Sequence, residues 1–454
     1  MSCSKWLAIA FLGVALHAAN DPDGTTPLHW AVRSNDLPAV QRLLLAGADP
    51  DASNRYGVTP LALAAENASG PLVQTLLQAG AHPTNSILMT AARSGSGEVV
   101  RMLLGRGADA NARESSLGET ALMWAAAENH PDAVRALIEH GADPNERSDK
   151  LIYPKDRFGL EGVTTVLPHG SWTALMYAAR QGSLEAARAL AEMGADLNLA
   201  DPDGTTALEF AILNGHFDTA AMLTEKGADP NIADSTGMAA LYAAVDMSTL
   251  GEIYGRPARK SSDKLTAIDL IPVLLAHGAN PNATLKSPAL IRAHTPGEPS
   301  LGEGTTPLMR AAKNGDIAAM RVLMAHGADP LLKQKNGTTA LMFAAGLGRG
   351  TGVFAKDYAT EAQLLAGVTF LVESGLDVNA ANDAGQTALH IAAQASDGIV
   401  KYLAAHGANL DAKDKQGRTA LDVAMGKGVR ARIGGESTVR ESTAELLRTL
   451  MSSR

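Results

Sequence analysis

The sequence predicts an all-α solenoid, an array of short helix pairs stacked one on the next. Three observations support this prediction. A Thr-(Pro/Ala)-Leu tripeptide recurs along the 454-residue chain, a Gly-Ala-Asp/Asn tripeptide recurs between its copies, and the commonest spacing is 33 residues. A fixed period of this length is typical of repeat proteins, in which each unit contacts only its neighbours. The composition agrees: hydrophobic residues make up 46% of the chain and aromatic residues only 4%, as expected for closely packed helices rich in Ala and Leu.

The two tripeptides mark the ends of helices. Threonine is a favourable N-cap, and the proline that follows it in several copies suits the first helical position, where the missing N–H is not needed. Glycine supplies the left-handed residue that ends a helix. The threonine tripeptide begins at Thr26, Thr59, Thr120, Thr173, Thr206, Thr306, Thr339, Thr387 and Thr419, with weaker copies at Ser86 and Ala239. The glycine tripeptide begins at Gly47, Gly107, Gly141, Gly194, Gly227, Gly278, Gly327 and Gly407, with variants at Gly80 and Gly375.

The best copies of the unit, TPLHWA at 26–31 and TALHIA at 387–392, resemble the ankyrin repeat, a helix–turn–helix followed by a β-turn. The resemblance extends over about eleven repeats within residues 20–425. It implies a right-handed solenoid with β-turn or hairpin fingers along one edge. It also implies a protein or peptide partner on the extended concave surface.

Four segments interrupt the 33-residue period and are predicted to be insertions. They lie near 150–168, 246–263, 284–302 and 346–361. Insertions in solenoids form surface loops, often on the binding face. Two interpretations stay open, because long loops are tolerated at little energetic cost and need not bind anything. The segment 426–454 ends in an amphipathic stretch and is predicted to be a C-terminal cap.

The N-terminal segment, residues 1–19, has the pattern of a signal peptide. One positive charge, Lys5, precedes an uncharged run from Trp6 to Leu16, and small residues follow. The run is too short to span a bilayer and fits the apolar region of a signal peptide. We therefore expect an exported protein, periplasmic or secreted, with no membrane span after cleavage. The alternative is a cytoplasmic protein in which residues 1–19 cap the array.

The sequence gives no support for an enzyme, a cofactor or a metal site. The single cysteine, Cys3, lies outside the repeats, and most of the twelve histidines recur at equivalent positions of the unit, without HExxH spacing. The Gly-rich run at 346–352 does not fit GxGxxG, and no GxSxG occurs. The net charge of −9 disfavours nucleic acid as the partner.

Candidate partner-binding residues lie where the unit varies. One column, two positions after the conserved Leu, holds five of the 18 aromatic residues: Trp30, Trp124, Tyr177, Phe210 and Phe343. This column either forms an exposed ladder or packs against the second helix of its own repeat. Other candidates follow the Ala pair or lie at loop tips, and Trp, Tyr and Arg dominate binding hot spots. The predicted contact residues are Arg33, Tyr56, Arg93, Trp124, Tyr153, Phe158, Trp172, Arg180 and Lys313.

The predicted function is therefore non-catalytic. We expect a monomeric scaffold or inhibitor that binds a partner protein along its concave face and fingers. The alternative is an exported effector or regulatory module that modulates a partner enzyme. An extended concave surface is well suited to either role, but the same fold hosts unrelated functions.

Overall fold

The computed structural model describes residues 21–151, 169–249, 263–288, 300–348, 359–427 and 439–453. Its helices follow one another along the chain in short pairs. We call the first helix of each pair the inner helix, and the second the outer helix. The chain divides into two compact units, which are described separately. The first unit holds the residues up to Ala112 with 120–125 and 132–142, and the second holds 113–119, 126–131 and 143–454.

The first unit contains three complete helix pairs. Their helices are α1 (Pro27–Arg33), α2 (Leu37–Leu45), α3 (Pro60–Glu66), α4 (Gly70–Gln78), α5 (Asn85–Ser94) and α6 (Gly97–Leu104). The next pair, α7 (Ala121–Ala127) and α8 (Pro131–Glu139), contributes residues to both units. Inner helices stack on inner helices and outer on outer, because α1 packs against α3, α3 against α5, and α2 against α4.

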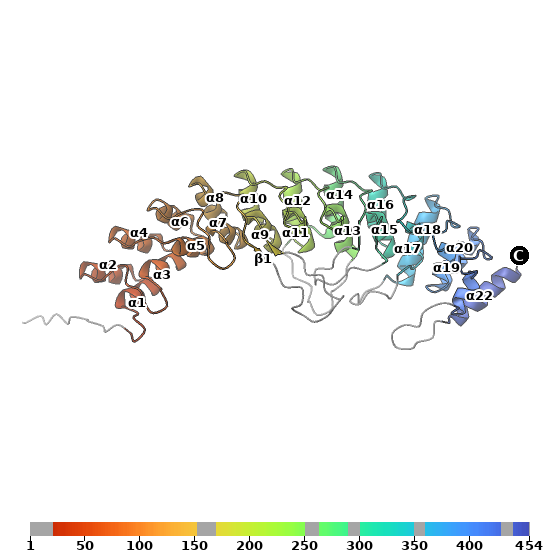
Figure 1. The fold of residues 1–454 in the computed structure, drawn as a ribbon, viewed down its shortest axis with the longest axis horizontal. Helices are drawn as coiled ribbons and strands as arrows, with labels where there is room; N and C mark the ends of the chain where they lie inside the picture. Colours follow the sequence, from red (N-terminus) through yellow and green to blue (C-terminus); the bar gives the residue numbers. More distant parts are fainter. Residues whose placement is uncertain are drawn as a thin grey trace, which may run out of the picture. The chain divides into compact units, whose positions relative to one another are not determined.

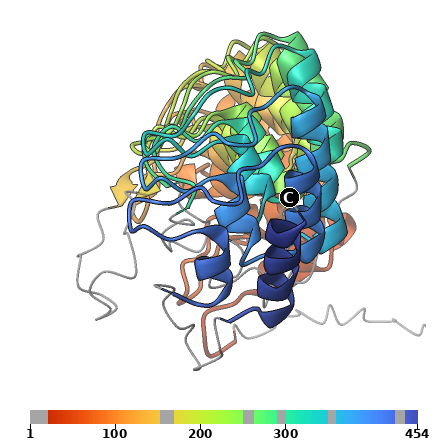
Figure 2. The same ribbon diagram turned by 90° about the vertical axis from the view of Figure 1, so that its right-hand side faces the viewer.

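The second unit continues the same pattern. Its helices are α9 (Ala174–Gln181), α10 (Leu184–Glu192), α11 (Ala207–Leu213), α12 (Phe217–Glu225), α13 (Ala240–Thr249), α14 (Ala267–Ala276), α15 (Pro307–Lys313), α16 (Ile317–Ala325), α17 (Ala340–Ala344), α18 (Glu361–Glu373), α19 (Ala388–Ala392), α20 (Asp397–Ala405), α21 (Ala420–Ala424) and α22 (Glu441–Ser452). Figure 1 shows the outer helices α10, α12, α14 and α16 in one row and their inner partners beside them, and Figure 2 shows the same layers along the stack. The all-α solenoid prediction is confirmed.

Threonine capping fixes where the inner helices begin. The Thr26 hydroxyl accepts the backbone N–H of His29, and that of Thr306 accepts the N–H of Met309. Pro27 and Pro307 occupy the first helical position, as predicted. The glycine after an outer helix has a positive φ, 89° at Gly327, which a residue with a side chain rarely adopts. Both end signals of the unit are therefore confirmed.

The core lies between the helix layers and is built from small residues. On α9, Ala178 and Ala179 are fully buried, and on α10 so are Ala186, Ala187 and Leu190. Alanine at these positions allows neighbouring helices to approach closely, and leucine fills the space between layers. Arrays of this kind gain their stability mainly from the interfaces between adjacent pairs.

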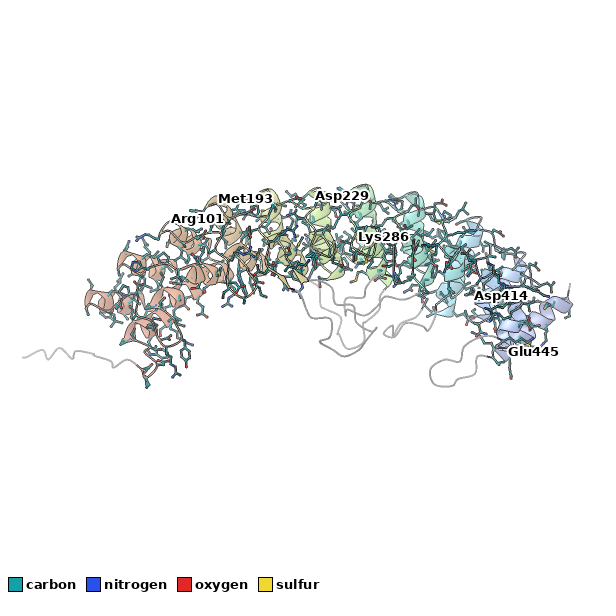
Figure 3. All side chains as sticks on the ribbon, viewed as in Figure 1. Arg101, Met193, Asp229, Lys286, Asp414 and Glu445 are labelled. Carbon is teal, nitrogen blue, oxygen red and sulfur yellow. The ribbon has the colours of Figure 1, made fainter. Side chains whose placement is uncertain are left out.

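Finger-like turns connect each outer helix to the next inner helix, and we call them fingers. Isolated bridges close three of them, Ala200 with Thr206, Ala233 with Ala239 and Lys333 with Thr339. Adjacent fingers also bond to each other: the Ser235 N–H donates to the Asp203 carbonyl at 2.7 Å. The fingers of the second unit are therefore hydrogen-bonded to one another rather than isolated loops. Figure 3 labels Met193, directly after α10, and Asp229, in the finger that follows α12.

Most of the predicted insertions lie outside the described residues. The structure describes only their ends: β1 (Lys150–Leu151) pairs with β2 (His169–Gly170) at the base of the first, and α13 extends to Thr249. Residues 1–19 also lie outside the described part of the chain. Near the C-terminus, α22 packs against α20 and α21. Across the residues that the structure describes, no helix is both long and apolar enough to cross a membrane.

Candidate partner-binding surface

Arginine–aromatic pairs line the inner helices where the sequence predicts partner contacts. The guanidinium carbon of Arg33 lies 5.8 Å from the ring centroid of Trp30. The same distance, 5.8 Å, separates Arg93 from the ring centroid of Trp124. Arg180 lies 5.2 Å from the ring of Trp172. Such cation–π contacts hold flexible arginines in place at a surface. The structure thus brings together four of the predicted residues in two pairs, Arg93 with Trp124 and Arg180 with Trp172.

Trp172 forms the centre of an aromatic cluster in the second unit. Its ring meets those of Tyr177 and Phe210 edge-on, at centroid distances of 5.4 and 5.1 Å. Its Nε1–H donates to Asp201 Oδ2 at 3.3 Å, and the Tyr177 hydroxyl donates to Glu119 Oε1 at 2.7 Å. All three rings are half-buried. The cluster therefore combines exposed ring surface with fixed polar groups, the composition of a binding hot spot.

The remaining predicted contact residues lie in different environments. Tyr56, at a finger tip in the first unit, is 65% exposed, and the Arg55 guanidinium lies 4.7 Å from its ring centroid. Lys313 is half-buried, and its Nζ donates to the Leu347 carbonyl at 3.1 Å. Tyr153 and Phe158 lie outside the described residues. Lys313 therefore has a structural contact, whereas Tyr56 is mostly exposed and contacts its neighbour Arg55.

The aromatic column that the sequence singles out does not form a uniform ladder. Trp30 is 50% exposed, Trp124, Tyr177 and Phe210 are half-buried, and Phe343 is fully buried in the core. In the same column, Arg310 is also buried and pairs with Asp246. Residues of this column therefore pack in the core in some repeats and are exposed to solvent in others.

Carboxyl groups accumulate beside the Trp172 cluster, which the sequence analysis did not predict. Burial raises the pKa of Asp201 and of Asp234, and the charge of Asp203 raises both further. Glu209 is 0% exposed, and its pKa is raised well above the ordinary value, first by burial and then by Asp234. Burial also raises the pKa of the Tyr177 hydroxyl. Aspartate is a common turn residue, so its presence in the fingers gave no functional signal.

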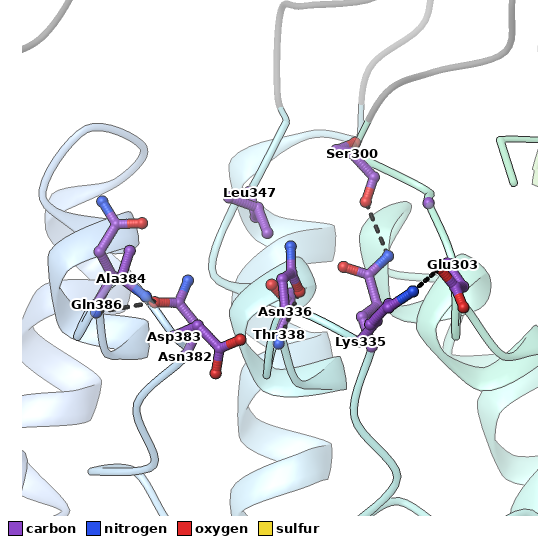
Figure 4. Close-up of a pocket in the computed structure, with 12 residues that line it drawn as sticks. Ser300, Glu303, Lys335, Asn336, Thr338, Leu347, Asn382, Asp383, Ala384 and Gln386 are labelled. Carbon is purple, nitrogen blue, oxygen red and sulfur yellow. Dashed lines mark hydrogen bonds and ion pairs between the residues drawn. The ribbon is translucent and has the colours of Figure 1, made fainter.

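A polar cavity lies among the fingers of the second unit, with a volume of about 870 Å³ (Figure 4). Its described lining is mainly amide, hydroxyl and carboxyl groups, with Leu347 on one side. Lys335 Nζ pairs with Glu303 Oε2 at 2.7 Å, and Gln334 Nε2 donates to the Ser300 carbonyl at 2.9 Å. These contacts are internal to the fingers. No histidine or cysteine stands among the described lining residues.

Six histidines among the described residues have structural partners in the repeat. In the inner-helix position, His29 and His390 bond to threonine through Nδ1 and to a backbone carbonyl through Nε2. At the ends of outer helices, the Nδ1 atoms of His140, His277, His326 and His406 lie 2.8–2.9 Å from the carbonyl four residues earlier. Within the described ranges, no group of three His, Cys, Asp or Glu residues could hold a metal ion.

Comparison with known proteins identifies the repeat. A family model described as ankyrin repeats (3 copies) matches residues 2–87, 67–148, 157–234, 265–353 and 357–431, which together are more than half of the chain. The chain is 31% identical over 122 residues to a transient receptor potential cation channel subfamily A member 1 homolog of Caenorhabditis elegans. That match covers 27% of this chain and 9% of the relative, so the chain spans less than a tenth of the relative's length.

Among solved structures, the chain is similar to the human ASB11 ankyrin repeat domain. The identity is 23%, the TM-score is 0.42, and the match covers 62% of this chain and 98% of that chain. The threonine-capped helix pairs, the fingers between them and the family match over most of the sequence have one explanation: this chain belongs to the ankyrin-repeat family.

Proposed function

We propose that this protein is a non-catalytic scaffold or inhibitor that binds a partner protein through its inner helices and fingers. Ankyrin repeats are general protein-interaction modules, which supports the class of function. The specific observation behind the proposal is the Trp172 cluster, where a half-buried indole contacts two further rings and an exposed arginine. Large aromatic rings and arginines at a surface contribute most of the binding energy in many interfaces.

We propose that each helix pair is one repeat, so that the array has eleven repeats and α22 completes the last. On this view, the C-terminal cap predicted over 426–454 is the outer helix of a final, modified repeat. Its buried Thr443, Ala444 and Leu447 contact the array, and its charged face points outward. A polar outer face is what the end of a repeat array requires.

The test is capture of the partner followed by measurement of its affinity. Cross-linking in the native cells identifies the partner, and titration calorimetry then compares wild type with Arg180→Ala and Trp172→Ala. Each variant is expected to bind at least about tenfold more weakly, as at a hot spot. Arg188→Ala, on the outer helix α10, is the matched control and should bind as wild type does. Equal losses in all three variants would contradict the inner-helix site, and a captured enzyme whose activity changes would support the effector role.

We propose export for the protein on the evidence of its N-terminal sequence. Intact-mass measurement of the native protein should show a chain that lacks residues 1–19. A mature chain that retains Trp6–Leu16 would contradict export and support the alternative, in which this segment caps the array in the cytoplasm. Light scattering of the same sample tests the expected monomer.

A further inference from the structure

We propose that the partner presents a basic segment, and that an arginine or lysine of this segment binds beside Trp172. This inference rests on the proposed function. The receiving surface consists of Glu119, Trp172, Asp201, Asp203 and Phe210 in the second unit, and we call it the acidic–aromatic patch. It is continuous: the rings of Trp172 and Phe210 are in contact, the Trp172 indole donates to Asp201, and Asp201 Oδ1 accepts the Asp203 N–H at 2.9 Å.

The negative charge of the patch is not neutralised by ion pairs within the described residues. Glu119, Asp201 and Asp203 of the patch take part in no described salt bridge, and neither does the buried Asp234 beside them. Their oxygens accept hydrogen bonds instead, from backbone N–H groups, the Trp172 indole and the Ser235 hydroxyl, the last at 2.6 Å from Asp203 Oδ1. These donors are neutral, so they fix the carboxylates in place without neutralising their charge. The half-buried Asp201 and Asp203 can meet a cation of the partner, whereas Asp234 is buried.

The buried carboxyl of Glu209 gives independent evidence of this uncompensated field. Glu209 is fully buried on α11, directly before Phe210, and its Oε1 has no hydrogen-bond partner. Its other oxygen, Oε2, accepts the Thr206 N–H at 3.1 Å. The influences that raise the pKa of this carboxyl include the charges of Asp234, Asp201 and Asp203, so these aspartates act on it together. No cation is among the main causes.

Two arginines close to the patch, Arg147 and Arg180, make contacts other than ion pairs with its carboxylates. Arg147 Nη1 donates to the carbonyls of Ser171 and Ala200, at 2.8 and 2.9 Å. Arg180 is exposed and lies over the Trp172 ring, so part of the indole already carries a guanidinium, and the partner's cation is expected beside Trp172, at the carboxylates and the Phe210 ring.

The chemistry of the patch selects a basic side chain over other cationic or charged ligands. A metal ion needs several ligands that converge, and the described residues offer no such group of three. Nucleic acid would be repelled by carboxylates. An arginine or lysine side chain satisfies both properties of the patch, because its charge pairs with Asp203 and its stem or guanidinium packs on the rings of Trp172 and Phe210.

The test uses an array of 12-residue synthetic peptides of random composition, followed by fluorescence anisotropy with the peptides that bind full-length protein. We expect the bound peptides to be enriched in arginine and lysine. Their affinity should fall about tenfold or more in Asp201→Asn/Asp203→Asn, and fall with added salt, as expected for a charge-assisted contact. Both substitutions keep Oδ1 as a hydrogen-bond acceptor, so the bonds from the Asp203 and Thr205 N–H groups and from the Ser235 hydroxyl remain. Asp201→Asn replaces Oδ2, the acceptor of the Trp172 indole, so Asp203→Asn alone tests the charge with that bond intact and should also weaken binding.

The matched control is Asp229→Asn/Asp329→Asn, which changes the net charge equally at turns that follow outer helices. It should leave peptide affinity within about twofold of wild type. Bound peptides without basic residues, or an equal loss in the control, would overturn the inference.

The Asp203→Asn single variant repeats the test if the double variant unfolds. If the captured partner binds wild type and Asp201→Asn/Asp203→Asn equally, the inference fails while the proposed function stands. If neither peptides nor a partner bind, the proposed function itself fails.

Discussion

The imidazole Nε2 of His390 lies 3.0 Å from the carbonyl oxygen of Arg418, which belongs to the next repeat. On the other side of the ring, Nδ1 lies 2.9 Å from the Thr387 hydroxyl and accepts the Thr387 N–H at 3.2 Å. The ring therefore caps its own helix and bridges to the neighbouring finger at the same time. His29 makes the same two contacts in the first unit, with Val58 as the bridged residue.

Replacing His390 with alanine should loosen the last repeat. The variant loses the bridge to Arg418 and leaves buried polar groups without their partner, which is expected to reduce the free energy of unfolding by about 2–3 kcal/mol. Amide hydrogen exchange in 420–424 should become faster. His326→Ala is the control, because His326 is exposed and bonds only within its own helix among the described contacts. Equal destabilisation of the two variants would contradict the bridging role.

Glutamate stands at this histidine position in one repeat, and it should make stability depend on pH. The pKa of Glu209 is raised in the folded state, so the unfolded chain loses this proton first as pH increases above about 4.5. The folded protein therefore loses stability as pH rises above that value, at up to about 1.4 kcal/mol per pH unit, until the folded pKa is passed. Glu209→Gln cannot titrate and should be more stable than wild type at pH 8.5, with a flatter profile.

Urea unfolding between pH 5 and pH 8.5 measures this effect. Asp201 and Asp234 also have raised pKa values, so part of the slope should persist in Glu209→Gln. Glu225→Gln, at an exposed position on α12, serves as the control and should leave the profile unchanged. A wild-type slope that survives intact in Glu209→Gln would show that Glu209 is not its source.

The sequence predicts the repeat far better than it predicts the surface. Local rules determine the helix ends, so Thr306 and Gly327 mark their boundaries without tertiary information. The pairing of Arg93 with Trp124 depends on contacts between repeats, which one repeat's sequence does not encode. The buried state of Phe343 and the acidic group around Asp203 depend on the packing of neighbouring fingers, so neither followed from composition or period.

Removing only the carboxylate from the ion pair of the buried Arg310 with the half-buried Asp246 should destabilise the protein more than replacing both residues. Arg310 is 5% exposed, and its Nε lies 2.5 Å from Asp246 Oδ1 across α13 and α15. Asp246→Ala leaves a buried guanidinium without this carboxylate and should reduce the free energy of unfolding by about 2–4 kcal/mol. Asp246→Leu/Arg310→Met replaces both charges with apolar groups and should be more stable than Asp246→Ala. Chemical denaturation of both variants checks the order, and the reverse order would contradict it.

A ladder of asparagines joins the turns of successive repeats, and Leu331 interrupts it. Asn282 Nδ2 donates to the Gly327 carbonyl at 2.9 Å, and its Oδ1 accepts the Asp329 N–H at 2.8 Å. Asn379 bonds in the same way to Gly407 and Asn409. Leu331 occupies the equivalent position, four residues after Gly327, and is 67% exposed.

Asparagine in place of Leu331 should complete the ladder and stabilise the second unit. The backbone is already suitable, because the Leu331 N–H donates to Asp329 Oδ1 at 2.8 Å, as the Asn379 N–H does to Asp377 Oδ1. Leu331→Asn would gain bonds to the Gly375 carbonyl and the Asp377 N–H, together about 1–2 kcal/mol. Thermal unfolding measures the gain.

Leu331→Ala removes the exposed leucine without adding an amide, so a gain of the same size in that variant would attribute the effect to the lost leucine. Asn282→Leu should lose about as much stability as Leu331→Asn gains, because it breaks the ladder one repeat earlier.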